Sequence, residues 1–408
     1  MRKQFLSIII LSGVSLFAQN LDLLMKYNSG YNASMGGTGL ASVKHISSMD
    51  MNPAELSNYS SMNLSVSQGA TYYGYDLLRI SSLVGEQFSN WNECIYNFDH
   101  VSFVIPTNHL SFGIGIYRKL SPHLINKKIA VTFSDLFAQE TKGSVYSLIV
   151  GLGYKPSNSV LLGISFSKYF GELNSIIRGE NHDIDLDKWV SMENDLSGFN
   201  FKCGLIYVHS NWSAGFTIEA PFKMKVKTSK HISDVQKYKY LLPHYDATDW
   251  HQPLVIASGV SYYGIEGFLI EADFEIRKYK SSDVQINLFE FGGNPIWQDV
   301  KIFRIGVEYK PADWNLPLKV GYAVIPQLYY SNNSIGLSNI ISSYQNTDQN
   351  IKYSYTVGTT LYLNKLSLDF AIDYSILKWN RTLIVPQTIE DDYKEKNIAF
   401  SVIASYSF

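Results

Sequence analysis

The sequence has few charges, few cysteines and no long apolar segment. Charged residues make up only 17 % of its 408 residues, below the roughly 25 % of typical soluble proteins. Two cysteines, Cys94 and Cys203, cannot build a disulfide framework. No segment reaches the roughly 18 apolar residues that a membrane-spanning helix needs. A net charge of −2 gives no electrostatic basis for binding nucleic acid. These shortages exclude helical membrane proteins, disulfide scaffolds and nucleic-acid-binding proteins.

Aromatic residues are abundant, and apolar residues alternate with polar ones. Phe, Trp and Tyr make up 14 % of the chain, and 29 of these residues are Tyr. Mean hydropathy is nevertheless −0.06, so polar residues dilute the apolar ones almost one for one. Low charge, many aromatics and such interleaving are typical of a β-barrel of the outer membrane.

The first 18 residues have the pattern of a secretory signal peptide. Arg2 and Lys3 form a charged start, residues 5–17 form an apolar centre, and Ala18 offers a small residue before a cleavage point. The alternative is a buried N-terminal helix. We expect residues 1–18 to direct export from the cytoplasm.

Period-2 alternation over about ten residues recurs from residue 62 to the C-terminus, which is the length of a tilted strand that crosses a membrane. A soluble sandwich also alternates, but its strands are usually shorter. The pattern predicts an all-β fold, a transmembrane antiparallel β-barrel over residues 62–408. Its fourteen expected strands are 62–72, 98–106, 109–118, 143–155, 159–170, 198–209, 212–225, 253–263, 267–279, 299–310, 318–329, 352–363, 366–378 and 397–408.

The connections between these strands alternate in length. Short connections rich in Asn, Gly, Pro and Ser, such as 107–108 and 364–365, suit tight turns. Long polar connections are expected at 73–97, 171–197, 226–252 and 330–351. Short periplasmic turns and long external loops are typical of bacterial outer-membrane barrels. An even number of strands then places the N-terminal segment and the C-terminus on the same, periplasmic, side of the barrel.

The two faces of each expected strand differ in polarity. In the strand 267–279, Phe268, Ile270 and Phe274 share one face, and charged residues share the other. We expect the charged face to line the lumen, where it either pairs with a plug and solvates the lumen or selects substrates. The members of this lumen charge network are Glu271, Asp273, Glu275, Arg277, Arg304, Glu308, Asp369 and Asp373.

Residues 19–61 do not alternate, and they contain two short motifs. The first combines Met35 with Gly36, Gly37 and Gly39, and the second is Asn52-Pro53-Ala54. Together they resemble the start of the FadL/TodX-type outer-membrane transporters for hydrophobic compounds. The resemblance implies that residues 19–61 form an N-terminal hatch inside a fourteen-stranded barrel. It also implies passive uptake of small hydrophobic molecules, such as long-chain fatty acids, without a cofactor.

A lumen of this size needs a plug. Fourteen strands about 4.8 Å apart and tilted by about 40° form a wall about 28 Å in diameter, whose interior is too wide for wall side chains to fill. Methionine is flexible and polarizable, so it suits contact with varied apolar ligands. Met25, Met35, Met49 and Met51 are therefore candidate ligand contacts. The alternative is that they only pack the hatch against the wall.

The last strand ends on an aromatic residue. Tyr406 and the terminal Phe408 lie on its apolar face. This ending resembles the terminal strand recognised by the barrel-assembly machinery, which we therefore expect as a partner during insertion, with outer-membrane lipid around the finished barrel.

No catalytic or metal-binding pattern is present. The sequence contains no H-E-x-x-H zinc motif and no G-x-S-x-G nucleophile elbow. We therefore expect that the protein has no catalytic residues, binds no metal and is not an enzyme. A second function stays open, because barrels of the type IX secretion apparatus share the small-residue segment and the Asn-Pro-Ala motif. Such a barrel would bind secretion components and hold cargo at the surface instead of transporting a ligand.

Overall fold

The computed structural model describes residues 30–42, 49–81, 85–120, 124–130, 135–181, 184–232, 249–281, 299–312, 314, 316–330, 333–336, 349–384 and 388–408. The expected signal peptide and Met25 lie outside these residues. Helix is confined, in the described part, to the short 3-10 turns η2 (Gly30–Met35), η3 (Pro53–Asn58) and η4 (Tyr279–Ser281). None of the described helices has the length and apolarity needed to cross a membrane.

The rest of the described chain is almost entirely β-strand. The strands are β1 (Asn63–Ser81), β2 (Gly85–Pro106), β3 (Leu110–Leu120), β4 (Leu124–Ala130), β5 (Asp135–Ser157), β6 (Val160–Asn181), β7 (Ile184–His209), β8 (Trp212–Glu219), β9 (Phe222–Ile232), β10 (Trp250–Gln252), β11 (Val255–Tyr262), β12 (Phe268–Arg277), β13 (Val300–Tyr309), β14 (Leu318–Tyr330), β15 (Asn333–Gly336), β16 (Gln349–Leu363), β17 (Leu366–Ile384) and β18 (Thr388–Ser407).

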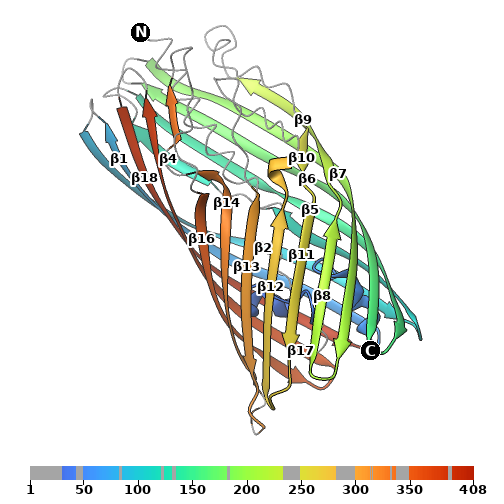
Figure 1. The fold of residues 1–408 in the computed structure, drawn as a ribbon. Coiled ribbons are helices and arrows are strands. Elements are labelled where there is room, and N and C mark those ends of the chain that lie inside the picture. Colours follow the sequence, from blue (N-terminus) through green and yellow to red (C-terminus); the bar gives the residue numbers. More distant parts are fainter. Residues whose placement is uncertain are drawn as a thin grey trace.

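These strands form one closed antiparallel barrel (Figure 1). β4 pairs with β5 as β3 does, β9 pairs with β7 as β8 does, and β10 pairs with β9, so these three continue other strands. β15 only adds a short parallel pairing to β17. The remaining fourteen strands close the wall, because β1 pairs with both β2 and β18. The all-β, fourteen-stranded prediction is confirmed.

Each of the fourteen predicted stretches overlaps a strand, but two predicted long connections are wrong. β1 and β2 stay paired as far as Ser81 and Gly85, through the expected loop 73–97. β6 and β7 likewise stay paired through most of 171–197, as far as Asn181 and Ile184. Polar residues occupy both faces of these extensions, so alternation disappears although the backbone ladder continues.

The predicted strand 212–225 is divided in two at Ala220-Pro221. β8 ends at Glu219, and β9 begins at Phe222. Pro221 has no backbone N–H to donate to the ladder, which favours a break at this point. β9 then pairs with β7 on one side and with β10 on the other, both antiparallel.

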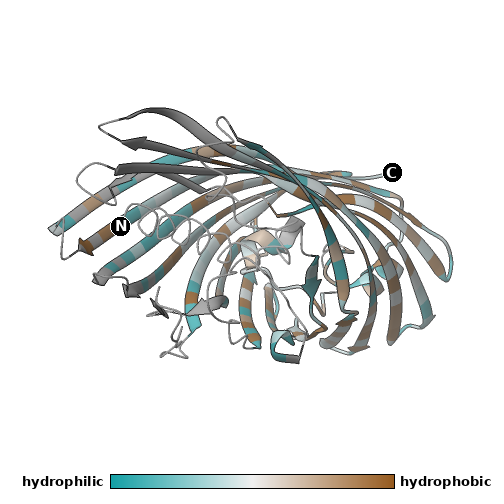
Figure 2. Cartoon of the chain, turned by 90° about the horizontal axis from the view of Figure 1, so that it is seen from above, coloured by the Kyte–Doolittle hydropathy of each residue, from teal (hydrophilic) through white to brown (hydrophobic). Residues whose placement is uncertain are grey.

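The outer surface of the barrel is apolar. Large apolar side chains alternate outward along most strands, and Phe166, Phe216 and Phe274 are exposed examples. Figure 2 shows the matching alternation of hydrophilic and hydrophobic segments along the wall. Soluble monomers rarely expose apolar patches above roughly 600 Å², and this surface extends around the whole ring, so it is suited to lipid.

The outward orientation of Phe274 on β12 gives a first test of the lipid-facing surface. Phe274→Arg places a charge on the outward face and should reduce the free energy of unfolding by about 2–4 kcal/mol if the site lies near the bilayer midplane. Phe274→Leu, the control, should cost far less because the surface stays apolar. Urea unfolding in phospholipid vesicles measures both. Equal costs would contradict the assignment of this face to lipid.

Candidate functional site

Residues 32–42 and 49–58, here called the inner segments, lie inside the ring of strands. They contact opposite parts of the wall. Ser213 Oγ of β8 donates to the Ala41 carbonyl at 2.6 Å, and the Gly36 amide donates to Thr356 Oγ1 of β16 at 2.8 Å. η3 contacts β3, β5, β6 and β7. A segment that touches so many strands is surrounded by them, and Figure 1 shows η2 and η3, in blue, between the front and back walls.

The glycines of the first motif allow close backbone approach. Gly36 has φ +69°, and a Cβ there would lie within 3 Å of backbone atoms of Tyr322 and Ile305. On the wall, Gly321 lies directly against Gly36 and Met35. Position 36 therefore needs glycine both for its left-handed backbone conformation and because there is no space for a Cβ atom. Gly37 and Gly39 also have positive φ, at +80° and +141°.

The Asn-Pro-Ala motif starts η3. Asn52 is the N-cap, its Oδ1 accepts a hydrogen bond from the Ala54 amide at 3.1 Å, and Pro53 occupies the first turn, which needs no N–H. Asn52 Nδ2 also donates to the Leu40 carbonyl at 2.7 Å. The motif therefore joins the two inner segments to each other.

Two carboxylates of β12 hold the first inner segment. Asp273 Oδ2 accepts from the amides of Gly39 and Leu40 at 2.8 and 3.2 Å. Glu271 Oε2 accepts from Thr38 Oγ1 at 3.1 Å. Buried acceptors of this kind offset the desolvation of amides that no strand or helix pairs.

The other predicted lumen charges lie in separate groups on the wall, and all of them are buried except the half-buried Asp373. Glu275 pairs with Arg277 at 2.6 Å and with Arg304 at 3.0 Å. Asp369 pairs with Lys319 at 2.8 Å. The remaining contacts are Glu308 with Lys319 at 4.0 Å and Asp373 with Ser354 at 2.6 Å. Lys319 was missed, although its position between Leu318 and Val320 puts it on the inward face by parity.

A second charged group was also missed. Asp50 forms an ion pair with Lys119, and its carbonyl accepts from Lys202 Nζ at 2.6 Å. Lys202 pairs in turn with Glu219 at 3.0 Å, and Asn200 donates to Glu219. Alternation puts Lys202 opposite the apolar face of its strand, so its facing was predictable, but its partners on the inner segment were not.

The methionine candidates pack against the wall. Met35 contacts Leu269, Met51 contacts Leu40 and Ala257, and all are buried. Met49 lies with Leu56, Val104, Tyr117 and Ile149. At the edge of that group, burial raises the pKa of the Tyr59 phenol well above its ordinary value, with Tyr117 and Glu55 adding to the shift.

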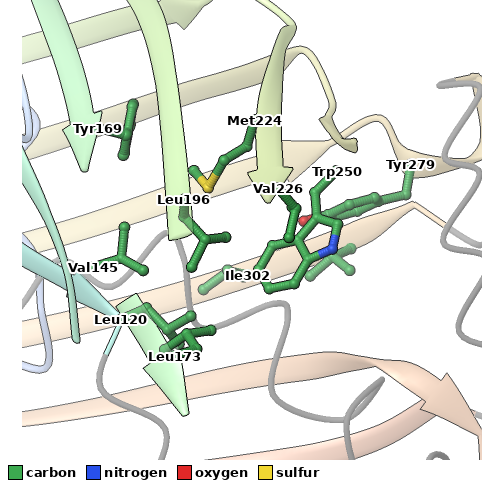
Figure 3. Close-up of a cluster of buried hydrophobic side chains, with 11 residues drawn as sticks. Leu120, Val145, Tyr169, Leu173, Leu196, Met224, Val226, Trp250, Tyr279 and Ile302 are labelled. Carbon is green, nitrogen blue, oxygen red and sulfur yellow. The ribbon is translucent and has the colours of Figure 1, made fainter. Parts of the chain in front are cut away.

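The largest apolar group lies elsewhere in the lumen. We call it the lumen cluster (Figure 3). Its residues come from several strands and from η4, and they are Leu120, Val145, Tyr169, Leu173, Leu196, Met224, Val226, Trp250, Tyr279, Val300 and Ile302, with Phe222 and Ile325 packed against them. None of its members belongs to the inner segments.

The lumen cluster is nearer the long connections than the inner segments are. On β6, Gly163 near the short turn faces Pro53, whereas Tyr169 and Leu173, further along, belong to the cluster. Tyr169 stacks on Phe222 at 4.8 Å between ring centroids, and its hydroxyl donates to Glu219 at 3.5 Å. An apolar layer therefore lies on the long-connection side of the inner segments and of the charged residues that contact them.

The C-terminal aromatics lie at the short-turn end, beside the closure of the wall. The Phe408 amide donates to the Met62 carbonyl at 3.0 Å. Its ring lies edge-on to Phe103 and Tyr406, with centroids 6.3 and 5.0 Å away. Both aromatic side chains of this ending are exposed.

Comparisons with known proteins agree on the fold. The BamG family model matches residues 23–317. A search of curated sequences finds no match. A FadL homologue of Pseudomonas aeruginosa has a TM-score of 0.64 at 12 % identity, over 92 % of this chain and 97 % of that one. The toluene transporter TodX of Pseudomonas putida has 0.59 at 15 %, over 93 % and 99 %. The toluene transporter TbuX of Ralstonia pickettii has 0.51 at 13 %, over 92 % and 97 %. These identities establish the fold alone, and none of the three comparisons supports the type IX relationship.

The contacts of Asp273 give the second test. Asp273→Ala removes the acceptor of two buried amides, and should cost about 1–3 kcal/mol and expose the inner segments to protease. Asp373→Ala is the control, because Asp373 accepts from Ser354 of the wall. Limited proteolysis followed by mass spectrometry measures cleavage within residues 32–58. Equal cleavage of the two variants would show that Asp273 does not hold this segment.

Proposed function

The chain belongs to the BamG family, and we propose that it is a bacterial outer-membrane β-barrel that admits small hydrophobic molecules passively. One observation carries the proposal. A fourteen-stranded wall encloses a buried apolar cluster with aromatic rings, above a layer of paired charges. Ligand sites are commonly concave and apolar with a few fixed polar groups, which is the composition of this layer.

The structural neighbours support the same class of compound. TodX and TbuX are described as toluene transporters, and CymD as a monoaromatic hydrocarbon channel, the last with a TM-score of 0.56 at 12 % identity. For this chain, the aromatic rings of Tyr169, Trp250 and Tyr279 favour flat apolar compounds, and the apolar side chains around them suit an acyl chain. Long-chain fatty acids and aromatic hydrocarbons are the proposed ligands.

In this proposal the inner segments act as the hatch, within the expected range 19–61. They occupy the lumen at the short-turn end, where an apolar ligand would have to pass before it reached the periplasm. Their contacts are numerous but local: amides to Asp273, Asp50 to Lys119, and Asn52 between the two segments. A ligand therefore passes only if these contacts yield or if it leaves through the wall. No enzymatic step and no cofactor is required.

Uptake tests the proposal. Leu173→Asp places a charge in the lumen cluster and should lower uptake of radiolabelled oleate and of toluene by about tenfold, because an unpaired buried charge costs several kcal/mol and attracts water. Leu173→Met keeps the side chain apolar and of similar size, and should keep uptake.

Cells that lack the protein provide the decisive comparison for this test. If wild-type and deletion strains take up both compounds equally, passage of hydrophobic molecules is not the function. Secreted proteins that are released from the surface of the deletion strain would then favour the type IX role.

The C-terminal strand is the proposed contact with the barrel-assembly machinery. Deleting Phe408 removes the terminal aromatic, its amide bond to Met62 and its contacts with Phe103 and Tyr406. We expect slower insertion and accumulation in the periplasm, whereas Phe408→Tyr, the control, should insert normally. Insertion is measured by heat-modifiable migration in gel electrophoresis and by surface labelling. An unchanged rate of insertion after the deletion would contradict this role.

A further inference from the structure

The polarity of the two faces is reversed between β8 and β9. Along β8 the inward residues are polar, including Thr217 and Glu219, and the outward residues include Phe216 and Ile218. Along β9 the inward residues are Met224 and Val226 of the lumen cluster. The outward residues are Lys223, Lys225 and Lys227, here called the lysine row, and all three are exposed. The reversal occurs at the Ala220-Pro221 break.

The height of this reversal coincides with a change of polarity on the outward face of the neighbouring strand. On the neighbouring β7, the outward face changes from Phe199 to Ser197 and Asp195. Ser197 lies opposite Lys225, and Asp195 lies opposite Lys227. The lysine row therefore lies where the outward face of β7 changes from apolar to polar, at the end of the barrel away from the short turns.

The described residues neutralise the row only in part. Lys223 pairs with Asp249 at 3.0 Å. No ion pair joins Lys225 or Lys227 to another residue that the structure describes, although Asp195 is across the ladder from Lys227. Alternate residues of a strand lie about 7 Å apart on one face, so the three ammonium groups repel one another. An external anion with several charges would relieve this repulsion.

We propose that the lysine row binds the phosphate groups of a diphosphorylated glycolipid in the outer leaflet around the barrel. Lysine side chains at the edge of an apolar surface can keep their methylenes against acyl chains while the ammonium groups reach the head groups. Lysines near an anionic membrane surface contribute about 1 kcal/mol each. The inference rests on the membrane setting of the proposed function, but not on passage of a ligand.

Native mass spectrometry of the full-length protein in a zwitterionic detergent tests the inference, with lipid A as the probe. Wild type should retain lipid A in preference to phosphatidylglycerol and phosphatidylcholine, and retention should decrease with added salt. The triple variant Lys223→Gln, Lys225→Gln, Lys227→Gln should lose at least about tenfold in apparent affinity. The same positions changed to Arg should retain it, because the charge is kept.

A matched control removes the same number of lysines at the other end of the barrel, as Lys155→Gln, Lys310→Gln, Lys365→Gln. This variant should bind lipid A as wild type does, and heat-modifiable migration confirms that every variant is folded. Equal losses in the two Gln variants, a loss in the Arg variant, or equal retention of phosphatidylglycerol would each overturn the inference.

The outcomes also separate this inference from the proposed function. If wild type fails to transport oleate and toluene but its lipid A binding depends on the row, only the transport proposal fails. If wild type transports both compounds and the Gln row variant still binds lipid A normally, only the lysine row proposal fails.

Discussion

Backbone hydrogen bonding is the constraint on which the rest of the structure depends. A strand in lipid has no water to satisfy its N–H and C=O groups, so every strand must have a neighbour on each side. The pairing of β1 with β18, from Asn63 and Ser407 upward, removes the last open edge. Closure at fourteen strands then sets a lumen that wall side chains alone do not fill. The position of the inner segments follows from this size.

Material inside the lumen must satisfy its own backbone without a ladder. The inner segments contain short 3-10 turns and left-handed glycines, so many of their amides need acceptors from elsewhere. The wall supplies these through Asp273 and Thr356, and Asn52 supplies others from within the segments. Wall glycines such as Gly321 let the two backbones approach closely. Asp273 and Lys202 are thus explained first by the backbone groups of the inner segments that they bond.

The sequence predicted the barrel well because lipid imposes a strict alternation. Every expected strand has a counterpart, and the parity that placed Asp273 inward also applies to Lys319 and Lys202. The extensions of β1, β2, β6 and β7 were missed because polar residues occur on both of their faces, so hydropathy there does not follow a strict period of two. Ion-pair partners such as Asp50 and Lys119 were not predictable either, because they depend on how an irregular segment lies in the lumen.

The strand break at Pro221 separates two parts of the wall whose inner and outer faces have opposite polarity. Below it the wall has apolar side chains outside and paired polar groups inside; above it the wall has lysines outside and the lumen cluster inside. Because inner and outer faces alternate strictly, a shift of one residue in parity exchanges the side chains of both faces at once. The change between β8 and β9 therefore couples an apolar interior at this height to a basic exterior. Under the proposed function, an apolar molecule in the outer leaflet meets the head-group layer and the apolar lumen at the same level of the barrel. The proposal therefore implies capture at the membrane surface and not near the short turns.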